Sequence, residues 1–387
     1  MFGALFFIRF FSFLPQKTER KSNKVIVLTG TFYSKNWINA HLLPLVTAKN
    51  VGHVYIVSKD INYNLNGLTV VKPSLQLSNV FGHTIARLIT FFLCSVKNKP
   101  DYIGGFHILF NATFSVLFAK VLRTRSIYFC VGGVTETLET GSSENSFFKF
   151  IKRKNDFLTS TICNIAANAD RIITMGNGAR AFLISKGGIA ERIHVISGAI
   201  DKTIFYPALI EEDKKYDLVL TARLSAIKQV DLFIDIVKNI NVKGTPCKGL
   251  IIGGGPLFES LKEYALKIDA LNYIEFAGHQ ENVLPWLHQS KINVLTSRSE
   301  GLALSLLEGL KVGLPGVVPN VGDLSDVLVD SYNGFLIENH SKDDFVLKII
   351  ELLNSPKLLA EFSRHAIQST KRFDLNEIQK QWFNVFE

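Results

Sequence analysis

Short apolar runs alternate with longer helical patterns along most of this chain. The run from Lys24 to Gly30 is apolar and ends at a glycine, which is typical of a buried parallel strand opening into a loop. Similar runs predict further strands at 53–58, 69–71, 101–106, 126–131, 171–174 and 192–196, and then at 218–221, 249–252, 273–276, 293–296, 316–318 and 335–337. Because helical patterns separate many of these strands, the chain is predicted to be α/β and doubly wound.

Two domains are predicted from the length of 387 residues, which exceeds one ordinary core. A proline and a charged run within 205–215 separate the two alternating patterns. This predicts a short segment at 1–22, a first Rossmann-like domain at 23–206 and a second at 207–369. Two such domains facing each other would leave a cleft lined by the carboxyl ends of strands, where ligands bind in these sheets.

Charge is divided unevenly between the two halves. Residues 1–206 hold 24 Lys and Arg against 10 Asp and Glu, a net charge of +14, and residues 207–387 hold 19 against 24, a net charge of −5. The positive charge of residues 1–206 predicts that this half binds an anionic partner. The alternative is that these residues are ordinary surface lysines and arginines in contact with water. Nucleic acid is not favoured, since no recognised nucleic-acid-binding motif occurs.

The first fourteen residues are apolar and rich in phenylalanine, and a basic cluster follows them. They are too short to span a bilayer and lack the features of a secretory signal. With a second aromatic and basic stretch at 147–154, they predict peripheral binding to an anionic membrane surface. The alternative is a segment packed on its own domain. Four scattered cysteines without a C-x-x-C pair indicate a reducing cytoplasm.

Candidate chemistry is densest between Ser299 and Pro315. Glu300 and Glu308 lie eight positions apart, with a turn at Gly301 and an apolar run that predicts a helix from about Ala303. The unpaired N–H groups of a helix start favour an anion such as a diphosphate. The two carboxylates are predicted to lie roughly 10 Å apart and to accept hydrogen bonds from two sugars. A surface glutamate or a helix cap is the alternative for each.

Upstream, Arg223 and Lys228 follow the strand predicted at 218–221. Two cations beside a strand end would neutralise phosphate oxygens. The alternative is a salt bridge from one of them to Asp231 or Asp235.

Four of these elements occur in order along the chain. They are the Arg223/Lys228 loop, the Gly253-Gly-Gly-Pro256 run, Phe276-Ala-Gly-His279 and the segment with Glu300 and Glu308. In these four elements the chain resembles family 4 glycosyltransferases. These are retaining enzymes of the GT-B fold, with two Rossmann-like domains facing across a cleft. The resemblance is strong over 216–340 and weaker over 169–207. It also implies that a closing helix at 370–387 packs back on the first domain.

By this resemblance, Glu308 binds the donor ribose and Glu300 the transferred sugar, while Arg223 and Lys228 stabilise the departing diphosphate. The remaining donor-binding residues implied are Gly30, Thr31, Gly254, Gly278, His279, Gly301, Leu302 and Ala303. For His279, an ordinary loop histidine is the alternative.

The chain departs from the family near Gly132, where many members carry a histidine. Glu136 or the Gly132 and Gly133 backbone are candidate substitutes, and His107 either faces the cleft or is a packed loop residue. The chain also has no Asp-x-Asp triplet and no His/Cys cluster. Transfer is therefore predicted to need no metal or other cofactor.

Together with the candidate residues, the resemblance implies a retaining transferase that moves a hexose-type sugar from a nucleotide-diphosphate donor, UDP-linked, to a lipid-linked or polysaccharide acceptor. The acceptor would be used in cell-envelope glycan synthesis, at the inner face of the cytoplasmic membrane. Two alternatives stay open: a sugar-nucleotide 2-epimerase of the same fold and a non-catalytic sugar-nucleotide-binding protein.

Overall fold

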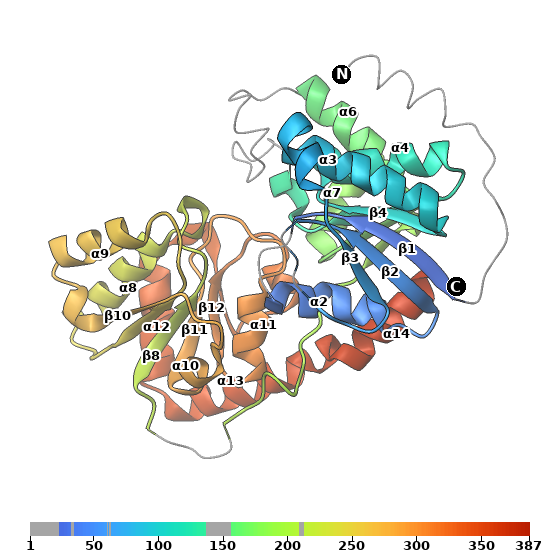
Figure 1. Ribbon diagram of the computed structural model, residues 1–387. Coiled ribbons are helices and arrows are strands. Elements are labelled where there is room, and N and C mark those ends of the chain that lie inside the picture. The colour runs from blue at the N-terminus through green and yellow to red at the C-terminus, as the bar shows by residue number, and fades with distance from the viewer. Residues whose placement is uncertain (1–22, 32–34, 60, 62, 137–155, 209–212) are drawn as a thin grey trace. The chain divides into compact units, whose positions relative to one another are not determined.

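The computed structural model describes residues 23–31, 35–59, 61, 63–136, 156–208 and 213–387. The chain divides into two compact units (Figure 1). Unit 1 comprises Met1–Ala199 and Leu375–Glu387, and unit 2 comprises Ile200–Asp374. The chain therefore changes units after Ala199 and after Asp374, whereas the predicted boundaries lie at 206/207 and 369/370. The segments 1–22 and 147–154, on which membrane binding was predicted, lie outside the described residues.

Unit 1 is built on a seven-stranded sheet in the order β3-β2-β1-β4-β5-β6-β7, with every neighbouring pair parallel. The strands are β1 (Lys24–Thr29), β2 (Val51–Val57), β3 (Leu68–Val71), β4 (Tyr102–Phe106), β5 (Arg125–Cys130), β6 (Arg171–Thr174) and β7 (Ile193–Val195). Each overlaps a strand that the apolar pattern predicts. In β1 the side chains of Ile26, Val27 and Leu28 are all fully buried, as expected where helices cover both faces of a parallel sheet.

Helices cover both faces of this sheet (Figure 1). They are α2 (Lys35–Val46), α3 (Leu75–Asn98), α4 (Thr113–Val121), α6 (Asp156–Ala167), α7 (Asn177–Ser185) and α14 (Leu375–Val385). On the α3 and α4 side, Phe91 and Ala119 pack against Val27 and Ile103. The closing helix α14 belongs to this unit, because Trp382 packs against Phe129 of β5 and Asn50 donates a hydrogen bond to the carbonyl of Phe383.

Unit 2 has a six-stranded parallel sheet in the order β10-β9-β8-β11-β12-β13. The strands are β8 (Tyr216–Thr221), β9 (Gly249–Ile252), β10 (Ile274–Gly278), β11 (Ser290–Val294), β12 (Gly316–Pro319) and β13 (Gly334–Ile337). The helices are α8 (Val230–Val242), α9 (Phe258–Lys267), α10 (Leu284–His288), α11 (Leu304–Lys311), α12 (Lys342–Leu353) and α13 (Pro356–Ser369). All six strands match predicted ones.

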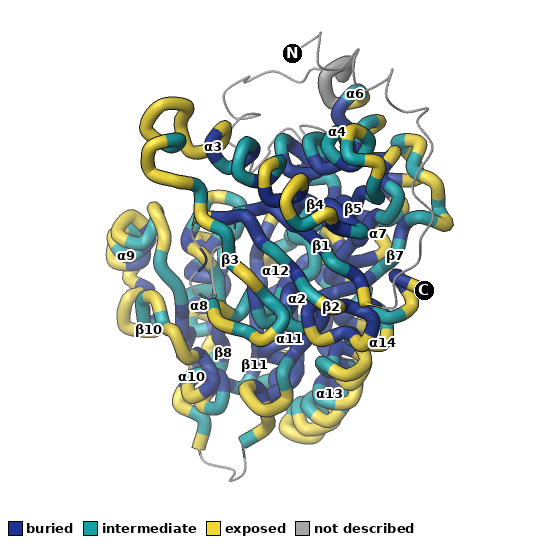
Figure 2. The backbone as a smooth tube through the Cα atoms, turned by 45° about the vertical axis from the view of Figure 1, so that its right-hand side comes forward, coloured by how far each residue is buried: buried dark blue, intermediate teal, exposed yellow. Residues whose placement is uncertain are grey.

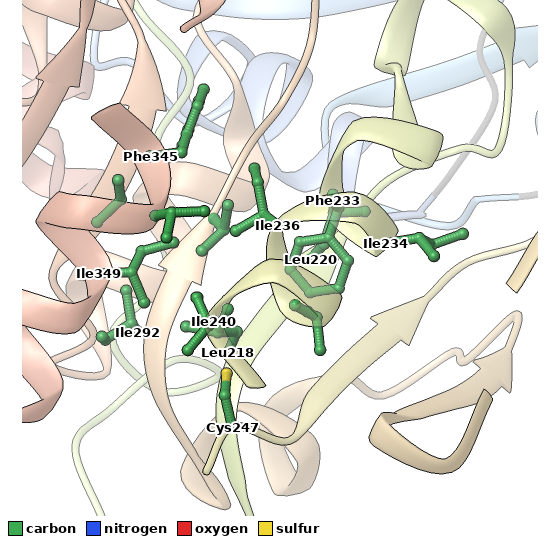
Figure 3. Packing of buried hydrophobic residues seen from close by; sticks show 14 of the residues in the cluster. Leu218, Leu220, Phe233, Ile234, Ile236, Ile240, Cys247, Ile292, Phe345 and Ile349 are labelled. Atoms are coloured by element: carbon green, nitrogen blue, oxygen red, sulfur yellow. The ribbon is translucent and has the colours of Figure 1, made fainter. Parts of the chain in front are cut away.

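Alternate residues of β8 enter two different cores, which follows from the two-residue period of a strand. Leu218 and Leu220 pack with Phe233 and Ile236 of α8 and with Phe345 of α12 (Figure 3). Val219, which lies between them, belongs instead to the cluster that includes residues of α10 and α11. The strands are thus buried, while the outer turns of helices such as α9 and α13 are exposed (Figure 2). This arrangement makes the sheet a rigid base for the loops at its carboxyl edge.

Candidate functional site

In unit 2, the loops that follow β8, β9 and β11 are joined by backbone hydrogen bonds. Leu224 N donates to Gly254 O at 2.9 Å, and Arg298 N donates to Ile227 O at 2.8 Å. Gly253 has a φ of +142°, and a Cβ on it would lie 1.8 Å from the carbonyl oxygen of Ala222. Only a glycine at this position allows the loop after β9 to come so close to the loop after β8. The predicted site residues on these loops therefore lie at one edge of the sheet.

An ion pair connects two of the predicted site residues. Lys228 Nζ lies 2.7 Å from Oε1 and 2.8 Å from Oε2 of Glu300, so the ammonium group bonds both carboxylate oxygens. The Lys228 side chain is 23% exposed and that of Glu300 is 8% exposed. The sequence analysis gave a salt bridge to Asp231 or Asp235 as the alternative for Lys228. The carboxylate that Lys228 bonds is instead that of Glu300, 72 positions away. A phosphate ligand and Glu300 would thus compete for the same cation.

The loops that carry Lys228 and Glu300 make side-chain contacts with backbone oxygens that the sequence pattern did not indicate. Thr296 Oγ1 donates to Lys228 O at 2.9 Å, and His340 Nε2 lies 2.8 Å from Ser297 O. Gly322 has a φ of +58°, and a Cβ there would lie 1.9 Å from Glu300 O. The sequence shows only that residue 322 is a glycine, a residue that adopts such a conformation readily, and its contact with Glu300 is set by the fold.

Helix α11 begins at Leu304, next to the start predicted near Ala303. Gly301 and Leu302 are partly buried and Ala303 is buried, so they form the turn that leads from Glu300 into this helix. Glu308 lies within the helix and is 6% exposed. A Cβ on the next residue, Gly309, would lie 2.2 Å from Asn293 Nδ2, so α11 packs very closely on β11. The Glu308 carboxylate is thus held on a buried helix that begins four residues after Glu300.

The remaining predicted donor residues of unit 2 lie at the end of β10 and in the β8 loop. Gly253 N donates to Gly278 O at 2.8 Å, and a Cβ on Gly254 would lie 3.5 Å from the Cβ of His279. His279 and Arg223 are both exposed. The structure thus brings Gly254, Gly278 and His279 together and leaves the Arg223 guanidinium at the surface of the unit.

In unit 1, an arginine that the sequence analysis did not single out holds the predicted Gly30–Thr31 loop. Arg87 Nη1 donates to Gly30 O at 3.2 Å and to Thr31 Oγ1 at 2.8 Å, and its Nη2 donates to Asn111 Oδ1 at 2.9 Å. Arg87 comes from the middle of α3, a helix with few other charges. A cation in the middle of an apolar helix was therefore the sequence signal for this contact.

Near the position of the expected histidine, the candidate substitute Glu136 is 5% exposed and accepts hydrogen bonds from its surroundings. Its donors are the backbone N–H groups of Ile108, Val131 and Gly132, the hydroxyl of Tyr128 and Nδ1 of His107. Burial by itself would raise the pKa of Glu136, but the hydrogen bond and charge of His107, with the other donors, lower this pKa on balance. Burial also raises the pKa of Tyr128 well above its usual range.

No cluster of three or more His, Cys, Asp or Glu side chains that could hold a metal ion occurs in the described part of the chain. Metal-independent transfer stays a prediction that awaits a measurement.

Comparison with known proteins shows which family the sequence of unit 2 resembles. Residues 201–369 match the family described as glycosyl transferases group 1. An uncharacterized glycosyltransferase of Methanocaldococcus jannaschii is 28% identical over 208 residues, which are 53% of this chain and 56% of that protein. A poly(ribitol-phosphate) alpha-N-acetylglucosaminyltransferase of Staphylococcus aureus is 28% identical over 167 residues, 43% of this chain and 34% of that protein. The alignments thus span about half or less of these two relatives.

The fold is also that of solved proteins. The crystal structure of Anabaena HepE in complex with UDP-glucose superposes with a TM-score of 0.71 at 14% identity, covering 94% of this chain and 99% of that one. Two parallel sheets with interleaved helices, one in each unit, confirm the predicted α/β class and the GT-B fold. Membership of family 4 in particular stays a prediction. Residues 201–369 thus resemble the glycosyl transferases of group 1, and the chain has the GT-B fold.

Proposed function

We propose that the protein is a retaining glycosyltransferase that moves a hexose-type sugar from a UDP-linked donor to a lipid-linked or polysaccharide acceptor of the cell envelope. The observation that carries this proposal is the Lys228–Glu300 ion pair at the edge of the unit 2 sheet, with the buried Glu308 on helix α11, which begins four residues after Glu300. A cation for phosphate and two carboxylates for sugar hydroxyls are what a nucleotide sugar requires.

In the proposed reaction, the bond from the sugar C1 to the diphosphate oxygen breaks and the acceptor hydroxyl attacks C1 from the same face. The departing phosphate oxygen takes the hydroxyl proton, so no enzyme nucleophile is needed. Lys228 and Arg223 stabilise the negative charge that develops on the diphosphate, a contribution that commonly amounts to several kcal/mol. Glu308 binds the ribose and Glu300 the transferred sugar.

The names of similar proteins support the donor and acceptor classes. The Staphylococcus aureus relative is named for transfer of N-acetylglucosamine to a poly(ribitol-phosphate), and the Anabaena structure holds UDP-glucose. These names favour a UDP-linked donor and an envelope glycan as acceptor for this chain.

Membrane association is part of the proposal, and α3 supports it. By length and composition, α3 qualifies as a membrane-crossing helix, and no other helix among the described residues does. It buries Phe91 and Leu88 in unit 1, while Leu75 is 79% exposed and Leu93 is 56% exposed. Residues 61–100 contain no Asp or Glu. An apolar face without acidic groups suits a helix lying in the interface of an anionic bilayer rather than one spanning it.

Liposome binding tests this part of the proposal. Leu93→Glu, and separately deletion of residues 1–14, are expected to weaken sedimentation with anionic vesicles at low salt. Leu347→Glu is a matched control, because Leu347 on α12 is also 56% exposed but belongs to unit 2. Equal binding to neutral and anionic vesicles, unaffected by salt or by either change, would point to a soluble glycan acceptor.

Product analysis tests the activity and separates the alternatives. Purified protein is incubated with UDP-glucose or UDP-N-acetylglucosamine, with and without octyl β-D-glucoside as acceptor. A new α-linked glycoside formed only with acceptor is expected. A changed sugar nucleotide without acceptor would instead identify a 2-epimerase, and binding without any product would identify a non-catalytic protein.

A further inference from the structure

A histidine and a buried carboxylate form a pair at the carboxyl edge of the unit 1 sheet. His107 directly follows β4, and its Nδ1 lies 3.2 Å from Glu136 Oε1, from the short helix Gly133–Glu136 that follows β5. The histidine side chain is 36% exposed, whereas that of Glu136 is 4% exposed. One member of the pair is therefore inside the unit and the other reaches its surface.

The backbone at and after His107 has an unusual conformation. His107 has a φ of +67°, and Phe110 nearby has a φ of +62°, both in the left-handed region that costs non-glycine residues energy. The segment Ile108–Ala112 follows directly, and Leu109 and Phe110 within it have non-helical backbone angles. Such strain persists only where surrounding contacts impose it, and the N–H of Ile108 bonds Glu136 Oε2 at 2.6 Å. The same carboxylate thus fixes both the ring and the strained backbone beside it.

The proton arrangement follows from the contacts of Glu136. This carboxylate accepts hydrogen bonds from three backbone N–H groups and from the Tyr128 hydroxyl, so it acts as an ionised acceptor. His107 Nδ1 must then be the donor in their contact, and in a neutral ring Nε2 becomes a hydrogen-bond acceptor. A carboxylate that sets the histidine tautomer in this way is a common arrangement in enzyme sites.

The geometry points to His107 as a residue that accepts a hydrogen bond from the acceptor hydroxyl, with Glu136 as the positioning residue. This inference rests on the proposed transferase function. The contact orients the hydroxyl oxygen toward C1 and transfers no proton, because the departing phosphate oxygen takes it. The titratable groups that face this pair among the described residues are Tyr128 and Cys130 on β5 and, through Asn111, Arg87 on α3.

The test measures transfer from UDP-glucose to octyl β-D-glucoside across pH with three variants of the full chain. His107→Ala is expected to lower kcat/KM for the acceptor at least tenfold, with the Kd for UDP unchanged within twofold. His107→Gln keeps an acceptor atom and should retain more activity than His107→Ala. Wild-type transfer should fall on acidification as the ring is protonated, and His107→Gln should lack that fall.

Glu136→Gln should lower transfer as His107→Ala does and should shift the acid limb. Tyr128→Phe is the matched control: it removes one neutral donor from Glu136, leaves the pair intact and should stay within about threefold of wild type. Unchanged acceptor kinetics and an unchanged pH profile in folded His107→Ala would overturn this inference alone. Absence of any wild-type transfer would instead refute the proposed function.

Discussion

Replacing Glu300 by glutamine is expected to tighten the binding of UDP while it weakens catalysis. Glu300 holds Lys228 through both carboxylate oxygens at 2.7 and 2.8 Å. A diphosphate must draw Lys228 away from this partner and must also approach a negative charge. Glutamine removes both obstacles, so the free lysine becomes available to phosphate oxygens.

The magnitude follows from the burial of the pair. Fully exposed ion pairs contribute about 0.2–1 kcal/mol, whereas removing one partner of a buried pair typically costs about 3–5 kcal/mol. With side chains 23% and 8% exposed, Lys228 and Glu300 lie between these limits. Release of Lys228 should therefore favour UDP binding by about 1–2 kcal/mol, which corresponds to a Kd lowered about 5- to 30-fold.

Isothermal titration with UDP measures this effect directly. Glu351→Gln is a suitable control because its partner Lys348 lies on the exposed surface of α12, where both side chains are over 40% exposed. That control should leave the Kd for UDP unchanged. In Glu300→Gln the gain should shrink with added salt, and sugar transfer should fall because a hydroxyl loses its carboxylate partner. A Kd equal to or weaker than that of wild type in Glu300→Gln would refute this account of the pair.

Four further predictions follow from the same structure. Glu308→Ala and Arg223→Ala should each lower transfer at least tenfold, about 1.4 kcal/mol, in steady-state assays of folded protein; near-normal turnover in both would contradict the donor-site assignment. Activity should survive EDTA, and a loss restored only by Mg²⁺ or Mn²⁺ would show a metal requirement. Gly322→Ala should displace the Glu300 loop and weaken UDP binding in titrations, because a Cβ there would lie 1.9 Å from Glu300 O. Burial lowers the pKa of His41 to about 3 from 6.5, so the unfolded chain binds the extra proton below pH 6.5. Stability should therefore fall by about 2 kcal/mol between pH 6.5 and 5, and His41→Gln should reduce that fall in chemical denaturation.

The sequence was sufficient for the elements and their order. Each predicted strand overlaps an observed one, and α11 begins at Leu304, one residue after the predicted start. The positions of strands and helices can be predicted in this way because the spacing of apolar residues that indicates each element lies within one short stretch of sequence. The loops of the candidate site follow from the same rule, since parallel strands place their carboxyl ends at one edge.

Tertiary structure decided which side chains meet at that edge. Lys228 is close in sequence to Asp231 and Asp235, yet it bonds Glu300, and Asp235 accepts from the hydroxyl of Tyr264 instead. The reason is that β8 and β11 are neighbours in the sheet although far apart in the chain. The order of strands in the sheet, which no local sequence pattern specifies, therefore determines that Lys228 pairs with Glu300.

The same reason explains the features of unit 1 that the sequence left open. Glu136 and His107 were separate candidates in the sequence, and the pairing of β4 with β5 makes them one hydrogen-bonded unit. Arg87 reaches the Gly30–Thr31 loop from a helix more than fifty positions away. By itself the sequence determined the alternating α/β pattern and the residue types suited to a nucleotide sugar. Only the folded chain decided their contacts, because these depend on how distant strands and helices pack, which local periodicity does not encode.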